Sequence, residues 1–386
     1  MINMKAIKVK IYPNEKQSEL IEKHFGCTRF IYNFGLELKV KTYNETKKSI
    51  SNFEIQKGLT KLKEEKPWLS EVNSQTLQQA LKDLDSAFSC FFKKQNQFPQ
   101  FKSKHTARKS FRIPQHFEII KGKHYLKLPK LGYIRFIDKF NIPEDALFRN
   151  ITISKDGSEY FASICWDQQI DAPEKSPIQE KKTVGIDLGT TTFATLSDGT
   201  TIKNHRFIKQ YEKQLAEEQR KLSLKKDRTT KSYQKQKEKV QKVHKKIRNT
   251  RKDWLHKTTT SLVENQDWTS YCIEDLAVKN LIQNNPTSMS KAISDVSWGM
   301  WRTMMEYKCQ DKGKNLIVIG RFEPSSKLCY CGTKNSELGR DEKVWTCKNC
   351  GITHNRDELA ANNIKNFGLI KSLGKDFSRS LCETSA

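Results

Sequence analysis

Three acidic residues stand in places where carboxylates are uncommon. Asp187 and Glu274 each lie inside a short apolar segment that predicts a buried strand, and Asp357 comes directly before the segment 358–367, which predicts a helix. A buried carboxylate is costly unless it is paired or binds a cation. A single such acid is most often a structural hydrogen-bonding residue, but three together favour one metal site. Their oxygen ligands suit magnesium or manganese.

Two divalent ions held by such acids would stabilise the attacking and leaving oxygens of a phosphodiester displacement, at a separation of roughly 3.5–4 Å. The three acids are therefore predicted to be both catalytic residues and magnesium ligands. A competing interpretation comes from the segment 185–191, which resembles the first phosphate motif of actin and Hsp70 ATPases. That class needs a later glycine-rich phosphate loop, and none follows, so a metal-dependent nuclease is favoured.

Four cysteines form two close pairs, Cys329 with Cys331 and Cys347 with Cys350, with fifteen residues between the pairs. This spacing predicts a four-cysteine zinc ribbon, although the first pair is one residue shorter than the usual Cys-x-x-Cys. Free thiols are the alternative. His354 is a possible substitute ligand, but we expect it in the turn that follows. The other six cysteines are expected to be reduced and mostly buried.

The charge of the chain indicates a polyanionic partner. Its 386 residues carry 70 Lys and Arg against 44 Asp and Glu, a formal net charge of +26. Neutralising phosphates releases counterions, so nucleic acid is the favoured partner, with a ribosome-associated or basic membrane-surface protein as alternatives. Aromatic residues at 10% predict a folded core. No signal peptide or membrane span is predicted, so we expect a cytoplasmic protein without membrane contact; the family resemblance described below implies a prokaryotic, nucleoid-associated one.

The order of predicted elements changes along the chain. A strand at 5–12 precedes helices that extend to residue 92, and several short alternating strands follow the basic loop 93–110. This order predicts a small β-barrel interrupted by a helical bundle. In the second half, buried strands flank a helical hairpin at 208–257, broken near 228–230, with 18 Lys and Arg against 6 Asp and Glu. A nucleic-acid groove and an ordinary solvated face are both consistent with that hairpin.

Together these residues resemble the TnpB (OrfB) proteins of bacterial insertion sequences, which are related to type V CRISPR effectors and Fanzor proteins. The resemblance covers nearly the whole chain. In the third acidic motif, Asn355 and Leu359 replace an acid and an asparagine, so we expect altered geometry beside Asp357. The motifs that carry the resemblance are 11–17, 25–33, Phe98-Pro99 with Phe101-Lys102, 185–189, 273–276, 324–327 and Arg356-Asp357.

The resemblance implies an RNA-guided endonuclease that cleaves duplex DNA next to a short adjacent motif, using a guide RNA from its own element. Asp187, Glu274 and Asp357 would be the catalytic acids, with Mg²⁺ or Mn²⁺ there and Zn²⁺ in the ribbon. A functional link to the element's transposase is possible under this resemblance, and a monomer is favoured. The alternatives are a guided DNA-binding regulator with weak or no cleavage, a transposition accessory protein, or a strand-transferring transposase.

The implied fold class is α+β and multidomain. An oligonucleotide-binding-like wedge β-barrel carries a helical recognition insert, and a ribonuclease-H-like (RuvC) α/β domain carries the zinc ribbon. The expected divisions are 1–13 and 106–167 for the barrel, 14–105 for the insert, 168–182 for a linker, 183–324 and 354–368 for the nuclease, 325–353 for the ribbon and 369–386 for a disordered tail.

Eight residues are expected to contact nucleic acid. Basic side chains of the 93–110 loop and the strand after it would bind phosphates, and a polar helix face of glutamines would read base edges, unless it is merely solvated. Phe98 and Phe101 are expected in the core rather than stacked on bases. The expected contacts are Gln75, Gln78, Gln79, Lys102, Lys104, Arg108, Lys109 and Arg112.

Overall fold

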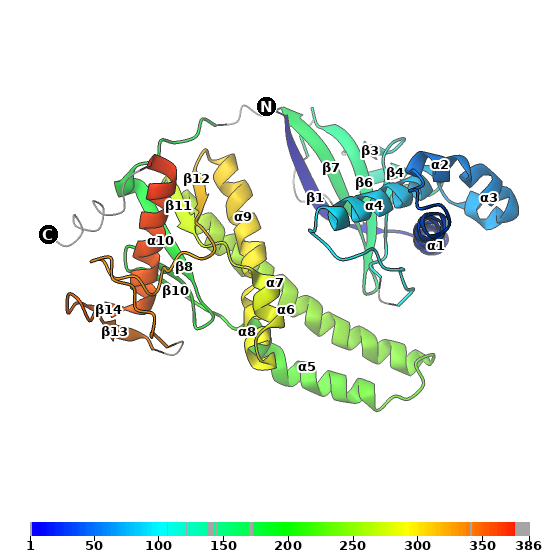
Figure 1. Cartoon of the computed structure of the whole chain (residues 1–386). Coiled ribbons are helices and arrows are strands. Elements are labelled where there is room, and N and C mark those ends of the chain that lie inside the picture. The colour runs from blue at the N-terminus through cyan, green and yellow to red at the C-terminus, as the bar shows by residue number, and fades with distance from the viewer. Residues whose placement is uncertain are drawn as a thin grey trace. The chain divides into compact units, whose positions relative to one another are not determined.

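The chain forms two compact units, Met1–Ile170 and Asp171–Ala386, each with helices and sheets (Figure 1). The mixed helix-and-sheet class with several sheets agrees with the prediction. Across the described residues, no helix is long and apolar enough to cross a membrane. The predicted tail, 369–386, lies outside the described residues from 375 onward. The computed structural model describes residues 2–105, 107–120, 122, 124–137, 142–143, 145–169, 173–339 and 342–374.

The first unit is built on a seven-stranded antiparallel sheet, ordered β2-β6-β7-β1-β5-β4-β3. Apolar residues alternate along its strands, and one face buries a core that includes Val9, Ile11 and Ile164. The turn at Asp156-Gly157 joins β6 to β7 in an antiparallel hairpin. The strands are β1 (Ile2–Tyr12), β2 (Ser110–Ile113), β3 (Glu118–Ile120), β4 (Tyr125–Leu128), β5 (Gly132–Phe136), β6 (Leu147–Asp156) and β7 (Glu159–Gln169).

Helices fill the segment between β1 and β2, as predicted. The first starts at a capping box in which Asn14 and Gln17 satisfy each other's backbone N–H groups. The core prediction is wrong for both phenylalanines of the loop, since Phe98 is 42% and Phe101 61% exposed, although the ring of Phe98 contacts those of Phe88 and Phe91. The elements are α1 (Glu15–Thr46), α2 (Asn52–Lys57), α3 (Leu59–Glu65), the short 3-10 helix η1 (Pro67–Glu71) and α4 (Ser74–Phe92).

The second unit is built on a five-stranded mixed sheet, ordered β10-β9-β8-β11-β12. β11 is parallel to both β8 and β12, while β9 is antiparallel to β8 and β10 to β9. β11 ends one residue before Glu274, so this acid follows the strand instead of lying inside it. The strands are β8 (Thr183–Leu188), β9 (Thr192–Leu196), β10 (Thr201–Lys203), β11 (Ser270–Ile273) and β12 (Asn315–Val318).

The helices of this unit include the predicted hairpin and the predicted last helix. The last helix is longer than expected, since it begins at Arg356 and reaches Leu373, and two short helices were not predicted. A two-stranded sheet, β13 (Val344–Thr346) with β14 (Thr353–Asn355), lies before the last helix. The helices are α5 (Phe207–Ser223), α6 (Lys231–Glu264), α7 (Val278–Gln283), α8 (Thr287–Val296), α9 (Trp298–Asp311) and α10 (Arg356–Leu373).

Helix α10 packs directly against the backbone of β8 (Figure 1). A Cβ added to Gly185 would lie 2.0 Å from the carbonyl oxygen of Ala361 and 2.7 Å from the amide nitrogen of Lys365. Asp187 is two residues beyond Gly185, on the same face of the strand. Asp357 is four residues before Ala361, on the same side of the helix. The close approach at Gly185 therefore brings the first and third acidic motifs together.

We predict that Gly185→Ala lowers the free energy of unfolding of the second unit by about 1–3 kcal/mol or more, because the added methyl group overlaps backbone atoms that cannot rotate away. Gly299→Ala in α9 is the matched control, since an added Cβ there meets no atom within 4 Å and alanine favours a helix. Thermal unfolding of the two variants measures the difference. Equal melting temperatures would contradict the packing described here.

Candidate active site

Asp187 and Glu274 lie side by side at the carboxyl ends of two parallel strands. In the register of β8 and β11, Ile186 is paired with Ile273, so the residue that follows each of them in the chain is one of the two acids. Ligands of open α/β sheets bind at this edge, where strands end and the chain turns away. The parallel pairing of the two apolar segments is therefore what unites acids that are 87 residues apart in the sequence.

Asp357 reaches the same region from the first turn of α10. Asn355 is the N-cap of this helix, and its Oδ1 accepts hydrogen bonds from the backbone N–H groups of Asp357, at 3.1 Å, and Glu358, at 3.4 Å. Asparagine and aspartate cap helices about equally well, so Asn355 meets this structural need in place of an acid. The helix dipole also favours a carboxylate in the first turn.

The electrostatics of Asp187 indicate that the three acids share one environment. Burial, followed by repulsion from the carboxylates of Glu274 and Asp357, raises the pKa of Asp187 to about 8, against the opposing effect of Arg356 and Lys343. Like charges that cannot both ionise freely are typical of functional sites. A divalent cation would relieve this repulsion, so the donor set fits a hard cation such as magnesium.

Glu274 is held by a neighbour from the loop before the cysteines. Ser325 donates a hydrogen bond from its Oγ to Oε1 of Glu274. Burial raises the pKa of Glu274, and the hydrogen bond from Ser325 opposes that shift. Ser325 was recognised only as part of the motif at 324–327, and its position against the second acid could not be derived from the sequence.

Lys343 is a site residue that the sequence analysis missed. Its Nζ lies 3.0 Å from Oδ2 of Asp357, in a pair that is partly exposed. The backbone carbonyl of Lys343 also accepts the N–H of Arg356, at 2.8 Å, which ties the segment before β13 to the start of α10. Nothing in the sequence distinguishes this lysine from the many other basic residues, since only the fold brings it to Asp357.

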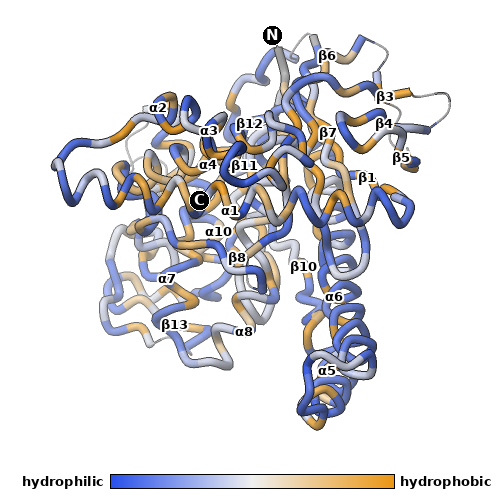
Figure 2. The backbone as a smooth tube through the Cα atoms, turned by 90° about the vertical axis from the view of Figure 1, so that its right-hand side faces the viewer, coloured by the Kyte–Doolittle hydropathy of each residue, from blue (hydrophilic) through white to orange (hydrophobic). Residues whose placement is uncertain are grey.

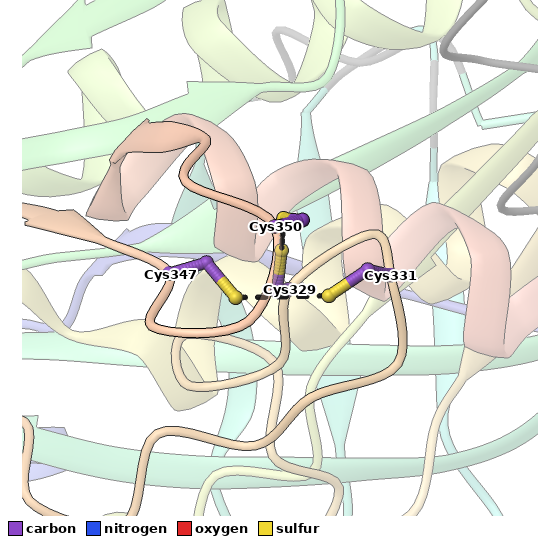
Figure 3. A group of neighbouring side chains, drawn as sticks. All are labelled: Cys329, Cys331, Cys347 and Cys350. Carbon is purple, nitrogen blue, oxygen red and sulfur yellow. Dashed lines mark hydrogen bonds between the residues drawn. The ribbon is translucent and has the colours of Figure 1, made fainter.

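The four cysteines form a cluster whose sulfur atoms all lie within 4.8 Å of one another (Figure 3). The Sγ atoms of Cys329 and Cys350 are 3.5 Å apart, and those of Cys331 and Cys347 are 3.6 Å apart. The shortened first pair therefore does not prevent the gathering of four thiols, which confirms the predicted cluster. Four sulfurs brought together in this way fit a tetrahedral structural metal site.

Two neighbours of the cluster, His354 and Leu359, differ from or explain what the sequence indicated. His354 lies in β14, not in a turn, and its Nε2 is 3.0 Å from Sγ of Cys329. Leu359 is buried and packs with Cys329, Trp345 and Cys347. This leucine therefore joins α10 to the core of the cysteine cluster.

The structure gathers five of the eight expected nucleic-acid contacts in one pocket of the first unit. Arg112 there is 3.6 Å from Asp83, and the carboxylate of Glu22 binds Lys109 at 2.9 Å. The pocket is lined by basic and polar side chains that come from α1, α4 and the segment 102–112. Its lining includes Gln79, Lys102, Arg108, Lys109 and Arg112, together with Arg29 and Asp83.

The remaining three expected contacts lie elsewhere. Lys104 lines a neighbouring pocket, to which Arg29 and Lys109 also contribute. The glutamines do not form one exposed face, because Gln79 is buried, Gln75 is half-buried and Gln78 is exposed. The prediction of one polar surface face is therefore wrong, since Gln79 lies on the buried side of α4, where it lines the pocket. Arg29 lines both pockets but was not among the expected contacts, although it belongs to the motif at 25–33.

Comparisons with known proteins extend these observations. The OrfB_IS605 family model, described as a "probable transposase", matches residues 163–285, and the Cas12f1-like TNB domain model matches 298–364. A protein of Streptomyces pristinaespiralis is 36% identical over 99% of this chain and 93% of its own length. The chain belongs to the TnpB (OrfB) family.

InsQ of Escherichia coli (strain K12) is 30% identical to this TnpB chain, with 94% of the chain and 92% of InsQ covered. Both relatives carry the name "putative RNA-guided DNA endonuclease".

Two further matches bear on the fold of this TnpB chain. A helix-turn-helix domain model matches residues 1–48, but these residues form strand β1 and the single long helix α1. A solved Cas12f1 complex with single-guide RNA and target DNA aligns with a TM-score of 0.54 at 11% identity, over 94% of this chain and 99% of that protein. This likeness shows a shared fold.

Asp187 predicts how the stability of the protein depends on pH without magnesium. The folded state keeps this proton up to about pH 8, while the unfolded state releases it near 3.8, so the free energy of unfolding falls as pH rises through this window. We predict that Asp187→Asn is more stable than the wild type. The difference in free energy of unfolding between this variant and the wild type should grow by on the order of 2 kcal/mol between pH 5.5 and 8.5.

Thermal unfolding of zinc-loaded, magnesium-free protein at both pH values measures this gap. Asp198→Asn is the control, since Asp198 lies in an exposed turn of the same unit, where its Oδ1 accepts the backbone N–H of Thr200. A gap that is constant with pH would contradict the shifted pKa of Asp187.

Proposed function

We propose that this chain is an RNA-guided DNA endonuclease of an IS605-type transposable element, and that Asp187, Glu274 and Asp357 are its catalytic acids. The observation that carries the proposal is the convergence of β8, β11 and the first turn of α10, which gives Asp187 its raised pKa. Support comes from family membership and from the names of the two full-length relatives. The enzyme would hydrolyse phosphodiester bonds of duplex DNA next to a short adjacent motif.

The proposed nuclease domain is ribonuclease-H-like, of the RuvC type. The support is the strand order β10-β9-β8-β11-β12, in which the first three strands in sequence are antiparallel and the last two are parallel to β8. The proposed limits are 183–324 and 354–368, with the ribbon at 325–353 between them. For the first unit we propose a wedge barrel of residues 1–13 and 106–167 with a recognition insert at 14–105, and 168–182 would link the halves.

We propose that the three acids hold magnesium or manganese. When bound, such ions stabilise the charge that develops on the attacking and leaving oxygens of a phosphodiester. The residues of the chain prepare the site: Ser325 orients Glu274, and the cap at Asn355 fixes the first turn that carries Asp357. Lys343 and Arg356 supply positive charge at the rim, where a phosphate would approach.

The cysteine cluster is proposed to hold zinc. Its tetrahedral sulfur set favours zinc among common cellular metals, and a structural zinc would fix the segment that contributes Ser325, Lys343 and the start of α10. In this proposal the zinc has no part in the chemistry. Its effect is to hold the third acid and its neighbours in place.

A guide RNA and the target DNA are the proposed partners. Helix α6 carries eleven Lys and Arg against three Asp and Glu, and nine of the eleven basic residues are exposed. Figure 2 shows mostly hydrophilic residues along α5 and α6. A guide that reads sequence by base pairing leaves the protein to bind phosphates, which such a surface does without base contacts. The pocket around Arg29 and Arg108 would add contacts in the first unit.

We predict that the protein, co-expressed with RNA from the flank of its element, cuts matching duplex DNA in magnesium, and that Asp187→Ala lowers the single-turnover rate at least about 1000-fold, as loss of a group that stabilises the transition state does. Asp198→Ala is the control, because Asp198 lies in an exposed turn of the same unit. Cutting by Asp187→Ala at the wild-type rate would refute the site. Guided binding without cutting by the wild type would instead identify a regulator.

We predict that Arg108→Ala weakens binding of the guide RNA and lowers the slope of log affinity against log salt by about one unit, because one phosphate contact is lost. Arg108 is exposed at the mouth of the basic pocket. Lys61→Ala removes the same charge from an exposed position in α3, outside that pocket, and is the control. Filter binding at several salt concentrations measures both. An equal loss in both variants would argue against a specific contact at the pocket.

A further inference from the structure

His354 contacts the buried member of the cysteine cluster. Cys329 is fully buried, and Nε2 of His354 lies 3.0 Å from its sulfur. The imidazole is fixed on its other sides, because its ring centroid lies 4.9 Å from that of Trp345 and 5.2 Å from that of Tyr330. A polar ring held in this way, 4% exposed, has a single orientation toward the sulfur.

The other three sulfurs of the cluster have hydrogen-bond partners other than His354. Four thiolates around a divalent ion leave a net charge of about −2, and a buried charge needs hydrogen-bond donors. The exposed thiols of Cys331 and Cys350 also face water, whereas Cys329 does not. Cys329 accepts the backbone N–H of Cys331, and Nε2 of His354 is within hydrogen-bond distance of the same sulfur. Cys331 accepts the backbone N–H of Thr333 and the side-chain N–H of Asn349, at 3.7 Å. Backbone N–H groups bind the other two sulfurs: those of Asn349 and Cys350 bind Cys347, and that of Ile352 binds Cys350.

The residue after His354 begins the helix of the third acid. Asn355 caps α10, and its side chain accepts the N–H of Asp357. His354 is also paired with Trp345 between β14 and β13, so the two-stranded sheet holds its backbone. Two hydrogen-bond contacts, joined by the peptide bond between His354 and Asn355, therefore lead from Cys329 to Asp357. No other described histidine or cysteine joins the cluster to the acids in this way.

We propose that His354 is a positioning residue that donates its Nε2–H to the Cys329 thiolate of the metal-loaded cluster and thereby sets the first turn of α10 that carries Asp357. The four cysteines are the ligands, and His354 is not one of them. Outer partners of this kind orient metal ligands and contribute to metal affinity. The link to Asp357 as a catalytic acid rests on the proposed function, whereas the contact with Cys329 does not.

Cobalt(II) in place of zinc in the full-length protein tests the contact directly, because thiolate-to-cobalt charge-transfer bands respond to hydrogen bonds at sulfur and d–d bands report the ligand set. We expect His354→Phe to weaken cobalt and zinc binding by about 10–100-fold and to shift the charge-transfer bands. The d–d bands should keep the pattern of four sulfurs. His354→Gln retains an N–H donor and should recover most of the lost affinity.

Tyr330→Phe is the matched control, since its ring contacts His354 but its change removes no donor to sulfur, and it should behave as the wild type. Unchanged metal affinity and spectra in His354→Phe would overturn the proposal. A change of the d–d bands to those of a site that has lost a nitrogen ligand would also overturn it, since His354 would then be a direct ligand.

The coupling to Asp357 has its own measurement. With the cluster saturated with zinc, we expect His354→Phe to weaken manganese binding at the acids about 3–10-fold by electron paramagnetic resonance titration, while Tyr330→Phe leaves it unchanged. Equal manganese affinity would overturn the coupling. Failure of the wild type to cut guided DNA would refute the proposed function but would leave the cobalt spectra and the contact at Cys329 to be judged separately.

Discussion

The candidate site depends on one close contact, that between the backbone of β8 at Gly185 and the backbone of α10 at Ala361. Without a side chain at residue 185, the helix lies against the strand at a distance that any Cβ would prevent. This approach brings a helix from the end of the chain to the strand that carries the first acid. Because the strand and the helix are rigid, Asp187, two residues after Gly185, must then lie near Asp357, four residues before Ala361. The acidic site is the consequence.

The carboxylates of Asp187, Glu274 and Asp357 repel one another, and neighbouring groups reduce this repulsion. The repulsion raises the pKa of Asp187, while Lys343 and Arg356 reduce it from the rim and Ser325 donates to Glu274. Each of these compensating groups except Arg356 comes from the segment between β12 and β14, which also contains the cysteine cluster. The cluster and the acids are therefore one structural unit, in which the folding of the sulfur-rich segment decides how the acids are surrounded.

Much of this arrangement could be predicted from the sequence, where local patterns sufficed. The apolar segments around Asp187 and Glu274 indicate buried strands, and the cysteine spacing indicates a cluster. Both features can be recognised from a few neighbouring residues in the sequence. What could not be predicted depends on tertiary packing. Gln79 has the polarity of a surface residue but lies on the buried side of α4. Lys343 is one basic residue among many until the fold brings it to Asp357. His354 was expected in a turn because the strand that contains it, β14, has only three residues, too few for an alternating pattern to distinguish a strand from a turn.

The central claim is that three carboxylates from β8, β11 and α10 form one divalent metal site. Anomalous diffraction from crystals of the full-length protein grown with manganese tests it most directly. The account predicts an anomalous peak that is ligated by carboxylate oxygens of Asp187, Glu274 and Asp357, and the loss of this peak in Asp187→Asn crystals. A manganese peak that excludes Asp357, or no peak at these acids while the cysteine cluster is occupied, would contradict it.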